Sequence, residues 1–448
     1  MNWSKLLSTK RTGQENRAYE HHDRTQFQRD YDRLIFSSPF RRMQDKTQVF
    51  PLPGSVFVHN RLTHSLEVAS VGRSLGNNVS RFLIENNKTS TPLAEELGSV
   101  TASACLAHDM GNPPFGHSGE KAISHFFTNG AGKNFKDLVE NPAIWNDFNN
   151  FEGNANAFRL LTQQFAGRRK GGFALTYTTV ASIVKYPYAS GTEGMKKYGF
   201  FQSEKDLYYN IAKELGIPEI PGKSEIFSRH PLVFLVEAAD DICYQIMDIE
   251  DAHKLGILST DETRELFLSF FNKSEDKNRL KHIDEVFREV TDTNEQIAYL
   301  RANIIGMFVS MCSNIFCENH DAIIEGNFKS PLINCLEGSS SEAMQKCIEI
   351  GYKRIYRHQS VAEIEIAGFK IIDSLLNEFI SAIINSSSHY SGLLLPFIPN
   401  QFRVEESNPV NMKIQAVLDF ISGMTDVYAL DLFRKINGIG LTDKRMKI

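Results

Sequence analysis

Thr101-Ala-Ser-Ala-Cys-Leu-Ala-His108-Asp109 is a short apolar segment that ends in a histidine and an aspartate. Its composition predicts a buried helix, and the turn-rich residues 111–120 that follow predict a loop. A histidine beside an aspartate offers one nitrogen and one oxygen ligand from a single helix end, a mixture that divalent cations accept. The loop adds His117 and Glu120, two side chains that can move protons. A cation with proton carriers beside it is typical of hydrolases.

Most of the chain shares this helical character. Apolar side chains recur at helical spacing in three other stretches, namely Leu62, Leu66 and Ala69, then Leu235, Ala239, Ile242, Ile246 and Ile249, and later Ile364, Ile371, Ile372 and Leu375. Period-two alternation is scarce, and only residues 49–52 and 55–59 fit a short hairpin around Pro53-Gly54. We therefore predict an all-α fold with a minor β-hairpin and extra C-terminal helices.

Composition narrows the class of protein. The chain has 448 residues, 42% of them hydrophobic, and a net charge of −5, which argues against a broad basic surface for nucleic acid or anionic membranes. We see no apolar run of about 18 residues and no apolar N-terminal leader, so we expect no membrane segment. The six cysteines form no Cys-x-x-Cys pair, which indicates reduced core residues of a cytoplasmic protein rather than zinc ligands.

Three parts of the chain can be distinguished. Residues 1–20 are polar and predict an N-terminal arm. Residues 21–255 hold the motifs and predict the core, with an excursion rich in Gly, Lys and Pro at residues 188–225. Residues 256–448 predict a C-terminal helical region packed on that core.

Acidic residues interrupt a second apolar helix, residues 231–249. Carboxylates are costly to bury without partners, and Asp240, Tyr244 and Asp248 recur every four residues, so they share one helix face. Such a face suits a metal-binding carboxylate followed by groups that meet a polar substrate. The alternative is a solvated face, which explains Asp241 but leaves an aromatic side chain between two acids unexplained.

His64 opens another amphipathic helix and, alone, fits a buried or a surface histidine equally. Together, His64, His108, Asp109 and Asp240 offer two nitrogens and two oxygens. This set can leave coordination positions open for water and a phosphate oxygen. The expected chemistry is attack of metal-activated water on phosphorus.

The order His…His-Asp…Asp resembles the HD phosphohydrolase superfamily. A closer resemblance is to its deoxynucleoside triphosphate triphosphohydrolases, the dGTPase family. The motifs that carry it are Asp32-Arg-Leu-Ile-Phe-Ser-Ser-Pro-Phe-Arg-Arg-Met-Gln-Asp-Lys-Thr-Gln48, Asn60-Arg-Leu-Thr-His-Ser-Leu-Glu-Val, residues 108–120, Phe151-Glu-Gly-Asn-Ala-Asn, Lys185-Tyr-Pro and Glu237-Ala-Ala-Asp-Asp-Ile-Cys-Tyr244. The resemblance covers roughly residues 20–250 and is looser beyond them, where Tyr356-Arg-His matches.

The resemblance implies a role for each motif residue. The metal ligands would be His64, His108, Asp109 and Asp240, because the family register selects Asp240 over its neighbour Asp241. The metal would be Mg²⁺ or Mn²⁺, with Fe²⁺, Co²⁺ or Zn²⁺ as alternatives. His117 and Glu120 match the catalytic histidine and its acidic partner. Glu120 would favour the charged imidazole, which would protonate the leaving 5′-oxygen or assist the attack.

The same resemblance implies the substrate-binding residues, which are Gln48, Arg61, Lys185, Tyr186, Tyr244 and Asp248. Tyr244 packed against C2′ would exclude a 2′-hydroxyl, and Asp248 would accept a hydrogen bond from the 3′-hydroxyl. Gln48 would meet the sugar edge, and Arg61 would hold phosphate oxygens bidentately unless it is a surface arginine. Lys185 and Tyr186 would contact phosphates or form a plain loop, and His125 would pack nearby as support.

The implied activity is hydrolysis of a dNTP, with dGTP preferred, to a deoxynucleoside and inorganic triphosphate, which would control dNTP pools. The alternatives are another HD enzyme, acting on nucleoside monophosphates or guanosine tetraphosphate, and a sensor that binds nucleotides or single-stranded DNA. The family also implies a homo-oligomer, a hexamer or tetramer, with a nucleotide or single-stranded DNA as candidate effector. In this chain Asn112-Pro-Pro stands where some relatives carry a further histidine.

Overall fold

The computed structural model describes residues 1–16, 23–50 and 58–440. Within these residues the fold is all-α, as predicted, and β pairing is limited to four isolated bridges. One bridge pairs Thr47 with Asn60 in antiparallel fashion. Most of the hairpin expected at residues 49–59 falls on residues 51–57, which lie outside the described residues.

The helices up to the acidic segment are α1 (Trp3–Leu6), α2 (Gln26–Ile35), α3 (Ser38–Arg42), α4 (Arg61–Glu85), α5 (Leu97–Ala107), α6 (Gly116–Thr128), α7 (Pro142–Asn149), α8 (Gly153–Thr162), α9 (Tyr177–Ser182), α10 (Lys205–Leu215) and α11 (Pro231–Lys254). The later helices are α12 (Thr260–Leu268), α13 (Lys277–Glu289), α14 (Thr293–Glu318), α15 (His320–Glu325), α16 (Gly338–Ile350), α17 (Gln359–Ile384), α18 (His389–Leu394), α19 (Val410–Ser422) and α20 (Asp426–Ile436). A π-helical turn, Gly351–Ile355, follows α16.

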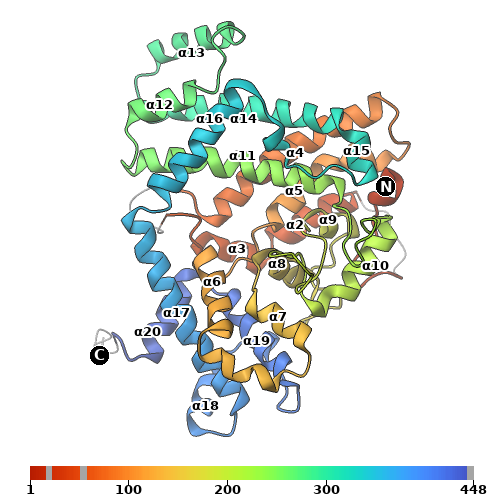
Figure 1. The fold of residues 1–448 in the computed structure, drawn as a ribbon, viewed down its shortest axis with the longest axis vertical. Coiled ribbons are helices and arrows are strands. Elements are labelled where there is room, and N and C mark those ends of the chain that lie inside the picture. The colour runs from red at the N-terminus through yellow and green to blue at the C-terminus, as the bar shows by residue number, and fades with distance from the viewer. Residues whose placement is uncertain (17–22, 51–57, 441–448) are drawn as a thin grey trace.

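Two hydrophobic cores stabilise the molecule. The larger, upper core in Figure 1 joins α4, α5 and α11 with α14, and fully buried side chains such as Leu75, Leu106, Ile242 and Phe308 belong to it. Burial of such apolar side chains is the main force that holds helices together. The core therefore combines helices of residues 21–255 with α14 from the predicted C-terminal region.

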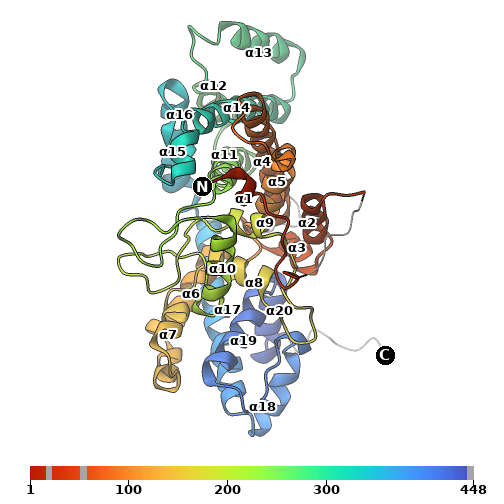
Figure 2. The same cartoon turned by 90° about the vertical axis from the view of Figure 1, so that its right-hand side faces the viewer.

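The smaller, lower core lies around α17, which runs beside α6 and also packs against α19 and α20 (Figures 1 and 2). It contains Phe126 and Phe127 from α6 and Phe379 from α17, all of them buried. Residues 337–440 therefore do more than cover the outside of the fold, because they complete a core with the segment that follows the His-Asp pair.

One described helix, α14, is long and apolar enough to cross a membrane by length and composition alone. No apolar run of about 18 residues marks this helix in the sequence. Its side chains Leu300, Ile304, Phe308 and Cys312 recur every four residues and are fully buried. They pack toward α11 and α4, so this face of α14 forms part of the upper core.

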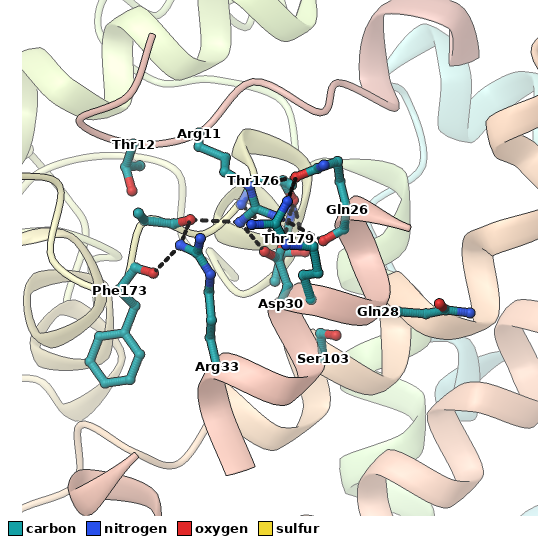
Figure 3. Close-up of polar contacts among 12 residues, drawn as sticks. Arg11, Thr12, Gln26, Gln28, Asp30, Arg33, Ser103, Phe173, Thr176 and Thr179 are labelled. Carbon is teal, nitrogen blue, oxygen red and sulfur yellow. Dashed lines mark hydrogen bonds and ion pairs between the residues drawn. The ribbon is translucent and has the colours of Figure 1, made fainter. Parts of the chain in front are cut away.

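Residues 1–16 pack against the molecule and do not form the expected polar arm. Trp3 and Leu6 are buried, and the N-terminal ammonium group donates to the carbonyl of Ile324 at 2.7 Å. Arg11 forms a buried ion pair with Asp30 and donates to the Gln26 carbonyl at 2.7 Å (Figure 3). A composition-based prediction failed here because these polar groups are buried together with their partners.

The excursion at residues 188–225 is also ordered by buried contacts. It contains α10, whose Tyr208 stacks on Phe200 with ring centroids 4.4 Å apart. Its start and middle are tied to Asp147 of α7, whose carboxylate accepts hydrogen bonds from the Ser190 hydroxyl and the Gln202 amide. The excursion is thereby held against α7 and, through α10, against α9.

Candidate active site

Three helices of the upper core bring the four expected metal-ligating residues together. Asn60 caps α4 in a reciprocal pair with Thr63, which fixes the start of the helix and places His64 in its first turn. His108 is the C-terminal cap of α5, with Asp109 directly after it. Asp240 lies near the middle of α11, which packs against both α4 and α5.

The ligand atoms of these residues converge. Those of His64, His108 and Asp109 lie within 4.8 Å of one another. Asp240 Oδ1 lies 3.0 Å from His64 Nε2 and 3.5 Å from His108 Nε2. Asp240, rather than its neighbour Asp241, therefore faces both histidines, in agreement with the helix-face argument.

The position of the proton on the His108 ring suits a metal ligand. Its Nδ1 lies 2.6 Å from the Cys105 carbonyl, which can only accept, so Nδ1 carries a proton and Nε2 points into the cluster. This Nε2 is buried and has no hydrogen-bond partner among the described residues. A buried nitrogen left without a partner is unfavourable, and a cation would satisfy it.

The charges of the cluster also favour a bound cation. Burial alone would lower the pKa of His108, but the carboxylates of Asp109 and Asp240 outweigh it and raise that pKa to about 9. Burial would raise the pKa of Asp240, but the two histidines outweigh it and hold that pKa well below its usual range. The pocket is therefore negative enough to keep a positive charge at this position, as a divalent cation requires.

Arg61 is a buried part of this cluster and not a surface arginine. It is 5% exposed, and its Nη1 donates to Asp109 Oδ2 at 2.7 Å. A Cβ atom at Gly116 would lie 2.6 Å from Arg61 Nη2, so the absence of a side chain at Gly116 makes room for the guanidinium. Asn112 donates to the other oxygen of Asp109. The carboxylate of Asp109 is thereby oriented from both sides.

His117 and Glu120 form the expected pair at the start of α6. His117 Nδ1 lies 2.7 Å from Glu120 Oε2, and this hydrogen bond raises the pKa of His117. The other oxygen of Glu120 accepts from the Gly153 amide at 2.8 Å. A Cβ atom at Gly153 would lie 2.5 Å from that oxygen, so the glycine of the Phe151-Glu-Gly-Asn motif allows this approach.

A cavity of about 320 Å³ opens over the cluster. Ten of the twelve predicted site residues line it, namely Gln48, Arg61, His108, Asp109, His117, Glu120, Lys185, Tyr186, Asp240 and Tyr244. His64 and Asp248 are not among the lining residues that the structure describes. His64 is 2% exposed and supports the floor from below.

Asp248 lies differently from the expectation of a direct sugar contact. It is buried, and its Oδ2 accepts a hydrogen bond from the Tyr356 hydroxyl at 2.7 Å. The Tyr356 ring in turn stacks on Tyr244, with centroids 6.0 Å apart and planes 24° apart. In this structure Asp248 therefore orients Tyr356, and Tyr356 supports the ring of Tyr244 at the cavity wall.

Basic groups gather on the side of the cavity near the excursion. Lys185 Nζ lies 2.9 Å from Glu237 Oε1, and Glu237 and Tyr186 raise the pKa of Lys185 against the effect of burial. Lys197 Nζ lies 5.8 Å from the centroid of the Tyr186 ring. The expected support residue, His125, makes an edge contact with Phe369 of α17, with ring centroids 5.0 Å apart.

Sequence reasoning missed Lys197 and Tyr356 as site residues, together with the lining residues Glu152, Asn154 and Gln245. The signals for the first two were slight. Lys197 lies in a lysine-containing excursion, and Tyr356 lies in the loosely matched Tyr356-Arg-His segment.

Comparison with known proteins agrees with this geometry. Residues 61–186 match the HD domain, and residues 337–435 match the phosphohydrolase-associated domain. The fold and the site therefore define a hydrolase of the HD phosphohydrolase class.

Named relatives extend the comparison. A Synechocystis protein named deoxyguanosinetriphosphate triphosphohydrolase-like is 37% identical over 98% of this chain and 100% of its own length. A Listeria monocytogenes protein of the same name is 34% identical over 98% of this chain and 100% of its own length. The deoxyguanosinetriphosphate triphosphohydrolase of Yersinia enterocolitica is 29% identical over 92% of this chain and 93% of its own length. This chain belongs to the deoxyguanosinetriphosphate triphosphohydrolase-like family, which confirms the resemblance seen in the motifs.

Proposed function

We propose that this protein hydrolyses dNTPs, with dGTP preferred, to a deoxynucleoside and inorganic triphosphate. The observation that carries the proposal is the convergence of two histidines and two carboxylates at the floor of a cavity with Tyr244 in its wall. The floor suits phosphate chemistry, and the tyrosine suits a sugar without a 2′-hydroxyl. Relatives named for dGTP hydrolysis support this choice of substrate.

The four clustered residues, His64, His108, Asp109 and Asp240, are the proposed ligands of a divalent cation, Mg²⁺ or Mn²⁺. Bound there, the cation would supply charge that activates water and neutralises the phosphate oxygens. The unpartnered Nε2 of His108 and the low pKa of Asp240 fit this role. Asp109 would keep its orientation through Arg61 and Asn112.

The proposed reaction adds water to the α-phosphorus and breaks its bond to the 5′-oxygen. The leaving 5′-oxygen then takes a proton, and the other product is inorganic triphosphate. His117 is the proposed donor, because Glu120 raises its pKa and so keeps the imidazole charged toward neutral pH. Arg61, Lys185 and Tyr186 are the proposed contacts of the phosphate chain, with Lys197 as an added cation beside Tyr186.

Deoxyribose selection is assigned to Tyr244, supported by Tyr356 and Asp248. A stacked, half-buried tyrosine cannot easily move aside, so a 2′-hydroxyl would meet its ring. Gln48, at the edge of the same cavity, is the proposed contact of the sugar edge.

The test is product analysis. The protein is incubated with each dNTP and NTP, singly and in mixtures, with Mg²⁺ or Mn²⁺, and products are separated by anion exchange. We expect triphosphate from dNTPs without diphosphate or monophosphate intermediates. Stepwise release of orthophosphate would contradict the proposal, and hydrolysis of nucleoside monophosphates or guanosine tetraphosphate alone would favour the alternative HD activity.

Mixtures of dNTPs also test activation. We propose that the protein acts in the cytoplasm as a homo-oligomer, a hexamer or tetramer, and that a nucleotide or single-stranded DNA modulates it. Family resemblance supports this assembly. Light scattering of the protein with and without dGTP or an oligonucleotide measures the assembly directly.

A further inference from the structure

Asp426, in the first turn of α20, contacts two remote segments of the site at once. Its Oδ1 accepts from the Phe115 amide at 2.9 Å, and its Oδ2 accepts from the Thr47 amide at 2.8 Å. Phe115 lies two residues before His117, and Thr47 lies one residue before Gln48. Asp426 is 7% exposed, so water competes little for these charge-assisted hydrogen bonds.

The Phe115 backbone needs such support. Its φ of +62° lies in the left-handed region, which bulky residues rarely adopt and which persists only where the surroundings enforce it. On the other side of the loop, a Cβ atom at Gly368 of α17 would lie 2.6 Å from the Phe115 side chain. The next turn is fixed as well, since the Ser118 hydroxyl donates to the Glu365 carbonyl at 3.0 Å. Two C-terminal helices therefore hold this loop from two sides.

Lys46 makes a second connection to the same loop. It is buried, and its Nζ donates to the Asn112 carbonyl at 2.6 Å and to the Ser422 carbonyl at 2.9 Å. The Asn112 side chain in turn donates to Asp109. The turn between α19 and α20 is thereby connected through Lys46 to the metal-ligating end of the loop.

His117 depends on this loop for its position. Its side chain is 71% exposed and is held by the hydrogen bond to Glu120. The direction of the imidazole therefore follows from the backbone at residues 115–117. Small errors in the placement of a reacting group reduce rates strongly, by about 100-fold for an error of about 1 Å.

We propose that Asp426 is a positioning residue for hydrolysis: it locks the strained backbone of Phe115 and so directs His117 toward the reacting phosphate. The segment that matches the phosphohydrolase-associated domain then has a defined task, because Asp426, Ser422, Glu365 and Gly368 all lie within residues 337–435. The catalytic part of this inference rests on the proposed function, whereas the lock itself does not.

The primary test is Asp426→Asn, which replaces one accepting oxygen by an amide nitrogen that faces a backbone N–H. We expect kcat to fall by about 10- to 100-fold, with KM changed less than about threefold. Thr425→Ala is the matched control, since Thr425 caps α20 by accepting from the Tyr428 amide but leaves the carboxylate in place. We expect Thr425→Ala to lower the unfolding temperature and to keep kcat within about twofold.

A double-mutant cycle separates positioning from general destabilisation. If Asp426 acts through His117, Asp426→Asn changes kcat little in a His117→Ala background. An equal fall in both backgrounds would overturn the proposal. Ser118→Ala, which removes the hydrogen bond to the Glu365 carbonyl directly after His117, serves if Asp426→Asn does not fold, and its effect on kcat should show the same dependence on His117.

Hydrogen exchange tests the lock without turnover. The amides of Asn112 and of residues 115–118 should exchange faster in Asp426→Asn than in the wild type or in Thr425→Ala, while amides of α4 stay protected. Unchanged exchange at residues 112–118 would overturn the lock. Faster exchange in a protein that releases no triphosphate from any dNTP would retain the lock and reject the proposed function, so the two failures are distinguishable.

Discussion

The two halves of the site are positioned in different ways. The proposed metal-ligating half lies on α4, α11 and the end of α5 in the upper core, where His64 is 2% exposed. The proposed proton-carrying half lies at the start of α6, at the edge of the lower core, where His117 is 71% exposed. Helix packing fixes the first half. A strained loop fixes the second, and residues that lie about 300 positions later in the sequence hold that loop.

This contrast indicates a division of tasks. A cation site needs several ligands at fixed distances, which a rigid helical core provides. A proton carrier must meet substrate, so it lies at the open side, and its position is imposed from outside the loop. A substitution in one half should therefore leave the other half intact, so that the function of that other half can still be measured.

The largest effect should follow from Asp240→Asn, which removes a charged group that contacts both histidines. We expect loss of bound metal and a fall in kcat/KM of at least about 1000-fold. Asp241→Asn is the matched control. Burial and the adjacent Asp240 charge raise the pKa of Asp241 to about 7, so the amide replaces a carboxyl that is already partly protonated.

Metal content by elemental analysis and turnover of dGTP check this prediction. Asp241→Asn should retain the metal and most of the activity. If the two variants lost metal equally, the assignment of Asp240 as the ligand on α11 would be wrong.

His117→Ala should affect only the other half. We expect kcat to fall by about 10²- to 10⁴-fold, the usual contribution of a positioned acid or base. Metal content should stay at the wild-type level, because His117 is not part of the cluster of ligand atoms. A variant that kept full turnover would remove His117 from the mechanism.

The same contrast decides how far sequence reasoning could reach. The proposed metal ligands could be named from the sequence because His64 and Asp240 lie in helices whose apolar spacing reveals which side faces inward, while His108 and Asp109 end an apolar helix. The all-α fold followed from the same periodicity. Long-range contacts leave no such local signal. Asp426 reaches Phe115 across 311 positions, so its part in the site could not be predicted.

The sequence did not indicate which polar residues are buried in pairs. Residues 1–16 look like a solvated arm by composition, but Arg11 meets Asp30 inside the fold (Figure 3). The contact of Asp248 with the sugar stays a prediction, but its hydrogen bond from Tyr356, which lies in a weakly matched segment, was not indicated by the sequence. Asp30 lies 19 positions after Arg11 and Tyr356 lies 108 positions after Asp248, so neither pair follows from the spacing within one helix.

Tyr244→Ala tests the cavity wall, and its effect on substrate preference should be of intermediate size. Removing the ring opens space at C2′, so we expect the preference for dGTP over GTP to fall by about 10- to 100-fold. Tyr356→Phe is the control, since it keeps the stacked ring and removes only the hydroxyl that donates to Asp248. The preference of Tyr356→Phe for dGTP over GTP should change less than that of Tyr244→Ala. Competition assays with both nucleotides measure the ratio, and an unchanged ratio in Tyr244→Ala would place sugar selection elsewhere.

The smallest effect should be a shift in pH dependence caused by Glu120→Gln. The hydrogen bond from Glu120 raises the pKa of His117, so in the wild type the charged imidazole persists above its ordinary pKa. Activity that needs this form is present below the raised pKa and is lost as the pH rises through it. Without the carboxylate the pKa falls, so the alkaline loss of kcat should begin at lower pH.

Lys197→Met provides a control of opposite sign. The charge of Lys197 lowers the pKa of His117, so its removal should move the alkaline loss to higher pH. Profiles of kcat against pH for the wild type and both variants measure the two shifts. If both variants moved the profile in the same direction, the alkaline loss would not report on His117, and its role as proton donor would be contradicted. Shifts in opposite directions would assign the loss to His117, with the metal-ligating half unchanged in both variants.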